Sequence, residues 1–379
     1  MTTLQSTFTP DPTLHNETPQ TPSQSISQKP TPTEKPSTEI TRDIAYYRKV
    51  ITPLLPAHFF ERQPVRAAIA VGLLIFNIGA IAFTMLAVES WALQLVLGAL
   101  IGFSNAGLAF ISHELLHGSV IKSRKMQDFL ALFTFLPFLM SPTFWRYWHN
   151  KLHHGNTQDV LHDPDCFPNM FIFRRSPFMQ RMIKFTPGAK TLVSYTYFMW
   201  WFSFQTVWNQ INLRFKTNMW KHLDQKRVSL EFGFQVALIV GYLILLGPSL
   251  WIPLALLPFF IQNYTLMSYI STNHNLSPLT KINDPLENSL SVSNHPLLEK
   301  LHFNFGYHVE HHIFPTMSGA FTKDVHKKLR EVFPQTYQCL PKWEALQMLY
   351  KTSRVYKNPT TLIHPSTGET WPVLQPKQN

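Results

Sequence analysis

The sequence has few cysteines and few charged residues for its length. Only two cysteines, Cys166 and Cys339, occur in 379 residues, and they form no CxxC pair. This scarcity argues against a disulfide framework and against a cysteine-bound zinc site. Charged residues make up 15% of the chain and hydrophobic residues 45%. The long uncharged segments of a membrane protein therefore have to be sought before soluble domains are counted.

The N-terminal region lacks large apolar side chains. Residues 1–40 include seven prolines and many Ser, Thr and Gln residues, a composition that cannot bury enough surface to offset its ordering entropy. We therefore expect a disordered cytoplasmic tail over 1–42. It has no basic stretch followed by an apolar one and no arginine before Arg42, which argues against a secretory signal and a transit peptide.

Recognised nucleic-acid motifs are also lacking, although the formal net charge is +11. Lys and Arg residues occur beside apolar segments, as at Arg174, Arg175 and Arg181. This placement fits the anionic surface of a membrane better than a nucleic-acid groove. We expect membrane contact and no nucleic-acid partner.

Four segments are long and apolar enough to cross a bilayer, which takes about 20 residues. They cover 65–87, 91–112, 232–250 and 251–271. Only short turns separate the two members of each pair, so we expect two helical hairpins. Two buried hairpins of a soluble protein are the alternative, but soluble core helices seldom run this long without a charged face.

The distribution of positive charge predicts the orientation of these hairpins. Several basic residues precede the first span, whereas the turns 88–90 and 247–250 contain none. Because Lys and Arg concentrate on the cytoplasmic side, both termini and the region between the hairpins should be cytoplasmic. We expect an all-α, multi-pass integral membrane protein with four transmembrane helices and a cytoplasmic helical cap. Its membrane domain should cover 43–340 and its cytoplasmic C-terminal tail 341–379.

Histidine is concentrated in three short windows at 113–117, 149–154 and 308–312. They hold eight of the 17 histidines: His113, His117, His149, His153, His154, His308, His311 and His312. Helical positions i, i+3 and i+4 share one face, so the histidines of each window can aim at one point. The expected topology brings all three windows, within the cap, to one membrane face.

Eight converging imidazoles indicate a metal site. Neutral imidazole is the commonest protein metal ligand, and one metal rarely accepts more than six ligands, so two metals are expected. Imidazole ligands leave zinc, copper, iron and nickel open. The first window alone, His113-Glu114-x-x-His117, also matches the zinc metalloprotease pattern with glutamate as general base. That alternative needs one further ligand and leaves the other windows unused.

The ordered set HxxxH, HxxxHH and HxxHH resembles the membrane fatty acid desaturase family over about 65–335. The flanking residues agree, as in Gly306-Tyr-His-Val-Glu-His-His-Ile-Phe-Pro315. The resemblance implies two irons that activate O2 and remove hydrogen from an acyl chain, so an oxidoreductase acting in lipid metabolism is expected. It also implies a further histidine ligand, for which His274 and His302 are candidates. The long second window also occurs in related lipid hydroxylases and ketolases, which remain an alternative.

Carboxylates near the windows are candidates to orient the ligands. Metal-bound imidazoles usually donate their second N–H to a carboxylate or carbonyl, and five acidic residues are placed for this role: Glu114, Asp159, Asp163, Asp165 and Glu310.

Two further apolar stretches are too short to span the membrane easily. Residues 129–140 should dip into the membrane or form an interfacial helix, and residues 195–208 should form an interfacial helix. We expect the lipid acyl chain to enter past 129–144.

The sequence shows no haem-binding cytochrome signature, ferredoxin-type cysteines or Rossmann glycine motif. The electron donor should therefore be a separate protein, a ferredoxin or cytochrome by family resemblance.

Overall fold

The computed structural model describes residues 42–374. The tail expected over 1–42 therefore lies outside the described residues, except for Arg42. The described chain is mostly helical, with five short strands.

Two long antiparallel helices follow the first basic residues. Helix α2 (Val65–Ala87) has the bounds expected of the first span. Helix α3 (Trp91–His117) continues five residues past 112 and carries the whole first histidine window on its last turns. Ser90 caps its start by accepting from the Leu93 amide. Gly118, at φ 85°, ends the helix, in a left-handed conformation that glycine adopts without steric cost.

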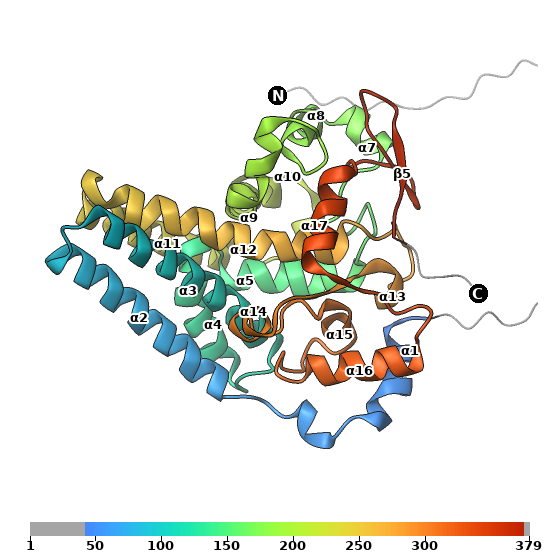
Figure 1. Cartoon of the computed structure of the whole chain (residues 1–379), viewed down its shortest axis with the longest axis horizontal. Helices are drawn as coiled ribbons and strands as arrows, with labels where there is room; N and C mark the ends of the chain where they lie inside the picture. The colour runs from blue at the N-terminus through green and yellow to red at the C-terminus, as the bar shows by residue number, and fades with distance from the viewer. Residues whose placement is uncertain (1–41, 375–379) are drawn as a thin grey trace, which may run out of the picture. The chain divides into compact units, whose positions relative to one another are not determined.

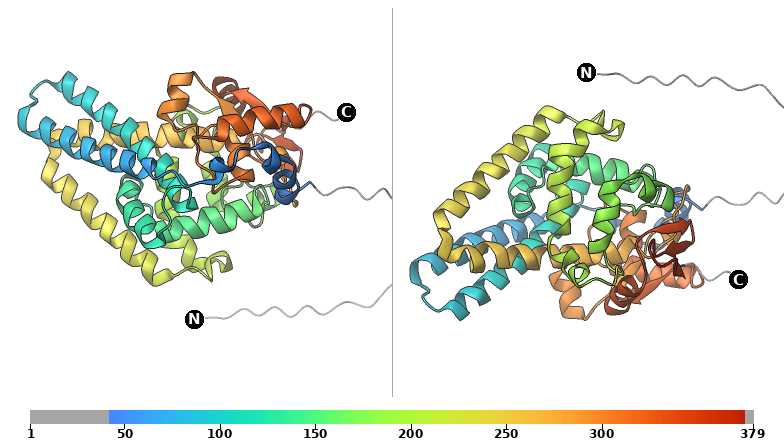
Figure 2. Two further views of the ribbon diagram at one scale, coloured as in Figure 1. Left: turned by 90° about the horizontal axis from the view of Figure 1, so that it is seen from below. Right: turned by 90° about the horizontal axis from the view of Figure 1, so that it is seen from above.

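A second pair of apolar helices packs against the first. Helix α11 (Gln225–Leu246) is followed by the short η9 (Pro248–Leu250), the π-helical η10 (Ile252–Leu256) and α12 (Leu257–His274). Among the described residues, α2, α3 and α11 are each long and apolar enough to cross a membrane. In Figures 1 and 2 these helices and α12 extend together, away from the shorter helices.

Helix α12 is the polar member of this set and lies inside it. The side-chain amide of Asn77 in α2 donates to Asn105 in α3 at 2.9 Å, and Asn105 donates to Gln262 in α12 at 2.7 Å. These two hydrogen bonds connect buried side chains of three helices, while Oδ1 of Asn77 has no partner within the described chain. The backbones also approach closely, because a Cβ on Gly98 would lie 1.9 Å from the carbonyl oxygen of Pro253.

Short helices connect α3 to α11. In chain order they are α4 (Arg124–Thr134), η3 (Leu136–Phe138), α5 (Pro142–Trp145), the π-helical η4 (Arg146–His153), α6 (His154–Asn156), α7 (Met170–Arg175), α8 (Pro177–Met182), η5 (Ile183–Phe185), η6 (Leu192–Thr196), α9 (Tyr197–Trp208), the π-helical η7 (Asn209–Leu213), α10 (Arg214–Lys216) and η8 (Asn218–Trp220). Helix α9 coincides with most of the aromatic stretch at 195–208 and packs along α12.

The remaining elements close around the histidines. They are α1 (Ile44–Ile51), η1 (Thr52–Leu54), η2 (Ala57–Phe60), α13 (Pro285–Asn288), β1 (Ser291–Ser293), α14 (Pro296–Leu301), α15 (His308–Ile313), α16 (Thr322–Val332), β2 (Cys339–Pro341), α17 (Lys342–Lys351), β3 (Tyr356–Asn358), β4 (Thr361–Ile363) and β5 (Thr370–Pro372). Strand β1 pairs in parallel with β2, and β3, β4 and β5 form an antiparallel sheet.

The described part of the segment 341–379 is folded onto the rest of the chain. Helix α17 packs on α12, and its buried Ala345 and Leu349 belong to the largest hydrophobic core, which also contains residues of α3, α5 and α9. The sequence pattern alone predicted only a tail here, because its strands are three residues long.

Candidate metal centre

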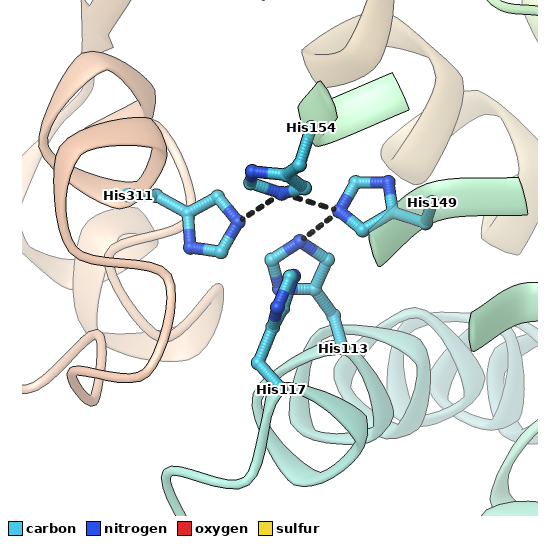
Figure 3. A group of neighbouring side chains, drawn as sticks. All are labelled: His113, His117, His149, His154 and His311. Carbon is cyan, nitrogen blue, oxygen red and sulfur yellow. Dashed lines mark hydrogen bonds between the residues drawn. The ribbon is translucent and has the colours of Figure 1, made fainter. Parts of the chain in front are cut away.

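Five histidines from four elements converge on one point. Each offers one ring nitrogen, and these nitrogens lie within 4.8 Å of one another. We call this the five-histidine group: His113 and His117 of α3, His149 of η4, His154 of α6 and His311 of α15. Figure 3 shows their rings directed toward a common centre.

Four other histidines converge beside them. The four-histidine group consists of His153 of η4, His274 at the end of α12, and His308 and His312 of α15. All four side chains are buried, whereas His117, His149 and His311 of the first group are only half-buried. The rings of His154 and His312 stack with centroids 4.3 Å apart, so the two groups are in direct contact.

The second and third windows each contribute histidines to both groups. This differs from the expectation that the histidines of one window face a single point. His149 and His154 join the five-histidine group while His153 joins the other. Residues Arg146–His153 form a π-helix, whose wider turn changes the angular spacing of the side chains. In α15, His311 turns to the first group while His308 and His312, one helical turn apart, face the second.

The five-histidine group fits a metal ion. The Nε2 atom of His149 lies 3.0 Å from that of His113 and 3.1 Å from that of His154, and the latter lies 3.1 Å from Nε2 of His311. A neutral imidazole has one N–H and one lone pair, so a nitrogen facing two others cannot be satisfied by both. Within the described chain the buried Nε2 of His117 has no hydrogen-bond partner. Convergent lone pairs of this kind are what a cation satisfies.

Burial keeps these imidazoles able to bind a cation. It lowers the pKa of His149, His154 and His311 well below the ordinary histidine value, and the neighbouring histidines lower it further. The rings therefore stay neutral, which metal ligation requires.

The four-histidine group shows the same pattern. Nε2 of His308 lies 2.8 Å from Nε2 of His274 and 3.2 Å from Nε2 of His312. Two of the Nδ1 atoms have outer partners: that of His274 lies 3.4 Å from the Asn288 carbonyl, and that of His312 lies 3.4 Å from the Thr157 hydroxyl. Such contacts fix the ring orientation. Within the described chain, Nδ1 of His308 has no hydrogen-bond partner.

A carboxylate pair supports His153. Its Nδ1 lies 3.0 Å from Asp163 and 3.7 Å from Asp165. Burial would lower the pKa of His153, but the two carboxylates outweigh burial and raise it. Asp165 also accepts from the indole of Trp148 at 3.0 Å and the amide of Gln205 at 3.3 Å, and burial raises its pKa to about 6.

The other three acidic candidates contact neither group within the described chain. Glu114 accepts from the Ser318 hydroxyl at 2.6 Å, and Glu310 accepts from the Ser291 hydroxyl at 2.5 Å. Asp159 pairs at 3.0 Å with His162, which is exposed.

The two candidate additional histidines are placed differently. His274 lies inside the four-histidine group. His302 lies in neither group of the described chain, and its Nδ1 is 2.8 Å from the Tyr269 hydroxyl. The backbone turns away directly after it, because Phe303 and Asn304 have φ of 55° and 60°.

A largely apolar cavity runs beside both groups. Its wall includes His113 and His149 of the first group and His153, His274 and His308 of the second. Phe135 and Met140, from the stretch expected to guide the acyl chain, also line it.

Several cavity residues had no sequence signal. Ala109, Met179, Trp201 and Met267 line the wall from four separate helices. Trp145 stacks on His149 with ring centroids 4.5 Å apart. Their roles arise only when the chain folds. The spacing of Trp145, one helical turn before His149, was the single available hint.

Comparison with known proteins identifies the family. The fatty acid desaturase family model matches residues 89–341, which is more than half of the chain. The chain is 23% identical over 322 residues to a chloroplastic omega-6 fatty acid desaturase of Brassica napus, a match covering 81% of this chain and 70% of that protein.

Two relatives from Synechocystis sp. cover more of their own length. One is named sn-1 acyl-lipid omega-3 desaturase (ferredoxin) and is 23% identical over 350 residues, 86% of this chain and 94% of the relative. The other, named sn-1 oleoyl-lipid 12-desaturase, is 20% identical over 341 residues, 86% of this chain and 93% of the relative. The metalloprotease alternative is therefore wrong, and the chain belongs to the fatty acid desaturase family of oxidoreductases.

Proposed function

We propose that this fatty-acyl lipid desaturase holds two iron ions, one in each histidine group. The observation that carries the proposal is the contact between the two groups, in which nine ring nitrogens converge beside one apolar cavity. The proposed ligands are His113, His117, His149, His154 and His311 for one ion, and His153, His274, His308 and His312 for the other.

Iron is preferred over the other metals that imidazole accepts because of the family to which the chain belongs. When bound, iron would activate O2 into an oxidant strong enough to remove hydrogen from a saturated acyl chain. The protein supplies the position, the orientation and the exclusion of water.

Each of these tasks has residues in the site. The apolar wall of Phe135, Met140 and Met267 can hold an acyl chain against the edge of both groups. The same apolar side chains would keep water away from an acyl chain held there. Asp163 holds the ring of His153 through its Nδ1, leaving Nε2 free to face the centre of the four-histidine group.

We further propose the membrane arrangement. The pairs α2–α3 and α11–α12, the latter including η10, form two hairpins, so that α12 is a fourth span shielded by the others. Both termini and the histidine windows lie on the cytoplasmic side, and the desaturase domain covers 43–340. This orientation is supported by the basic residues before α2. The turns 88–90 and 247–250, in contrast, contain no Lys or Arg.

The substrate is proposed to be an acyl lipid and the donor a separate electron-transfer protein. Support comes from the relatives named acyl-lipid desaturases, one of which is named with ferredoxin. Within the enzyme, two hydrogens leave the acyl chain and two external electrons are consumed for each double bond.

Lipid analysis tests the proposal directly. The chain is expressed in a host with simple saturated and monounsaturated lipids, and acyl chains are analysed by mass spectrometry. A new double bond is expected, together with two irons per purified chain. Hydroxylated products without new double bonds would contradict desaturation, and one metal per chain would contradict the two-iron proposal.

A narrowed cavity should alter the product. Ala109→Phe fills the cavity wall and should shift products toward shorter chains. Phe103→Trp is the control, because Phe103 lies on the same helix, is 54% exposed and does not line the cavity. An unchanged product profile for Ala109→Phe would contradict the assignment of this cavity to the acyl chain.

A further inference from the structure

A second hollow, separate from the apolar cavity, has four basic side chains among its nine lining residues. It lies where the start of α4, the π-helix η4 and the turn before α11 meet. Its basic residues are Arg124, Arg146, Lys151 and His222, and we call it the basic groove. The one carboxylate in its wall is Asp224, which caps α11 by accepting from the Arg227 amide at 3.0 Å.

Two of these basic residues are available to a partner. Arg146 is bound to Asp128 at 2.9 Å. Arg124 and Lys151 are exposed, and no ion pair joins either one to a carboxylate within residues 42–374. The groove therefore presents uncompensated positive charge from two different elements, which suits a rigid acidic surface.

The floor of the groove leads by a short path to the five-histidine group. Asn150 lines the groove and directly follows His149 in the chain. Its side-chain amide donates to the Leu116 carbonyl at 3.1 Å, and Arg146 donates to the same oxygen. Leu116 directly precedes His117. One peptide unit thus separates the groove floor from each of two histidines in the group.

We propose that the basic groove docks the acidic face of a small electron-transfer protein and passes its electrons through Asn150 and Leu116 to the five-histidine group. This inference rests on the proposed function, in which electrons come from a separate protein. Two reduced one-electron donors each lose one electron per double bond. With two protons from water and two hydrogens from the acyl chain, these electrons reduce O2 to two molecules of water.

The groove fits a protein better than a lipid headgroup. Its charges are spread over separate elements, so one phosphate could meet only some of them. The exposed apolar side chains of α4, Met126 and Phe129, lie further along the helix than Arg124. The groove thus lies at the charged end of α4, away from its apolar exposed face.

Reversing one charge tests the docking. Arg124→Glu changes an exposed residue in the first turn of α4, where a negative charge is favourable to the helix. In iron-loaded full-length enzyme in neutral-lipid nanodiscs, it should slow oxidation of a reduced [2Fe–2S] ferredoxin about tenfold at low salt. The difference should shrink as salt rises, because the screening length falls from about 10 Å at 0.1 M to about 3 Å at 1 M.

Arg174→Glu is the matched control, since Arg174 is exposed on α7 and lies outside the groove. Product formation driven by dithionite should be equal in wild type and both variants. Lys151→Glu is a second groove variant, and its iron content is measured because it lies between His149 and His153. It should slow ferredoxin oxidation in the same way while keeping its iron.

The outcomes separate the two proposals. Equal ferredoxin rates in wild type and Arg124→Glu, with normal dithionite activity, would overturn the docking proposal alone. A slow rate for Arg124→Glu only when anionic lipid is added, without a change in ferredoxin binding, would assign the groove to lipid headgroups and overturn it too. No desaturation by the wild type under dithionite would instead reject the proposed function.

Discussion

The two histidine groups differ in their surroundings more than in their ligands. The five-histidine group has three half-buried members and adjoins the basic groove through Asn150 and Leu116. The four-histidine group is wholly buried, and three of its four rings have a carboxylate, carbonyl or hydroxyl partner on the outer side. The first group is therefore more accessible to solvent and partners, and the ring orientations of the second are more firmly held.

The largest expected effect comes from removing a ligand from either group. His308→Ala in the four-histidine group and His117→Ala in the five-histidine group should each lower activity by more than about a hundredfold, since outer partners alone are worth 10- to 100-fold. Iron per chain should fall in both. His302→Ala, outside both groups, should keep its iron. Loss of iron from this variant would contradict the proposed ligand sets.

Removing the carboxylate support should affect one group selectively. Asp163→Asn weakens the contact to Nδ1 of His153 and should lower metal affinity about 10- to 100-fold in the four-histidine group only. Titration with iron, followed by absorption, measures this affinity. Asp159→Asn is the control, because Asp159 pairs with the exposed His162 and accepts from the Leu161 amide, and within the described chain it contacts neither group. Equal losses in the two variants would refute a special role for Asp163.

The difference in burial predicts two phases of metal loss. A chelator should remove iron first from the five-histidine group, whose rings are partly exposed, and later from the buried group. The time course of iron release, measured from the coloured chelate, should show two rates. A single rate for both ions would mean that the two groups open together.

The smallest expected effect concerns the support of α15. Ser291 accepts from the amides of His308 and Val309, both at 3.1 Å, and donates to Glu310. Ser291→Ala should cost about 1 kcal/mol, as the loss of a helix cap usually does, and lower the thermal midpoint while activity is largely kept. Ser123→Ala, which removes the cap of α4, is the control for a lost cap: it should lower the thermal midpoint by a similar amount. No change in the midpoint for Ser291→Ala would contradict the capping role.

Sequence patterns indicated which histidines gather, but not how the windows are divided between the two histidine groups. Hydropathy located α2 to the residue, because its apolar run begins after Pro64 and ends before Glu89. The histidine windows follow from residue type and spacing alone. The division of the second window between two groups does not, because it depends on the π-helix of η4, and the spacing of the histidines does not predict a π-helix.

Other features depend on contacts distant in sequence. Spacing alone could not distinguish His274 from His302. Only the fold shows that the end of α12 reaches the second group, while His302 binds Tyr269. Likewise, the wall of the cavity joins Ala109, Met179 and Met267 from distant helices. Hydrophobic residues such as these fit any core until the chain brings them together.

The amide chain from Asn77 through Asn105 to Gln262 has a consequence for biogenesis. If α2–α3 and α11–α12 enter the bilayer as hairpins, the first one is complete at His117, 145 residues before Gln262 is synthesised. Until then, the side-chain N–H of Asn105 lacks its acceptor on Gln262. In lipid, the missing hydrogen bond costs about 1 kcal/mol. The α2–α3 hairpin would then expose a polar group that only α12 satisfies. We therefore expect it to stay with the insertion machinery until the α11–α12 hairpin has been inserted.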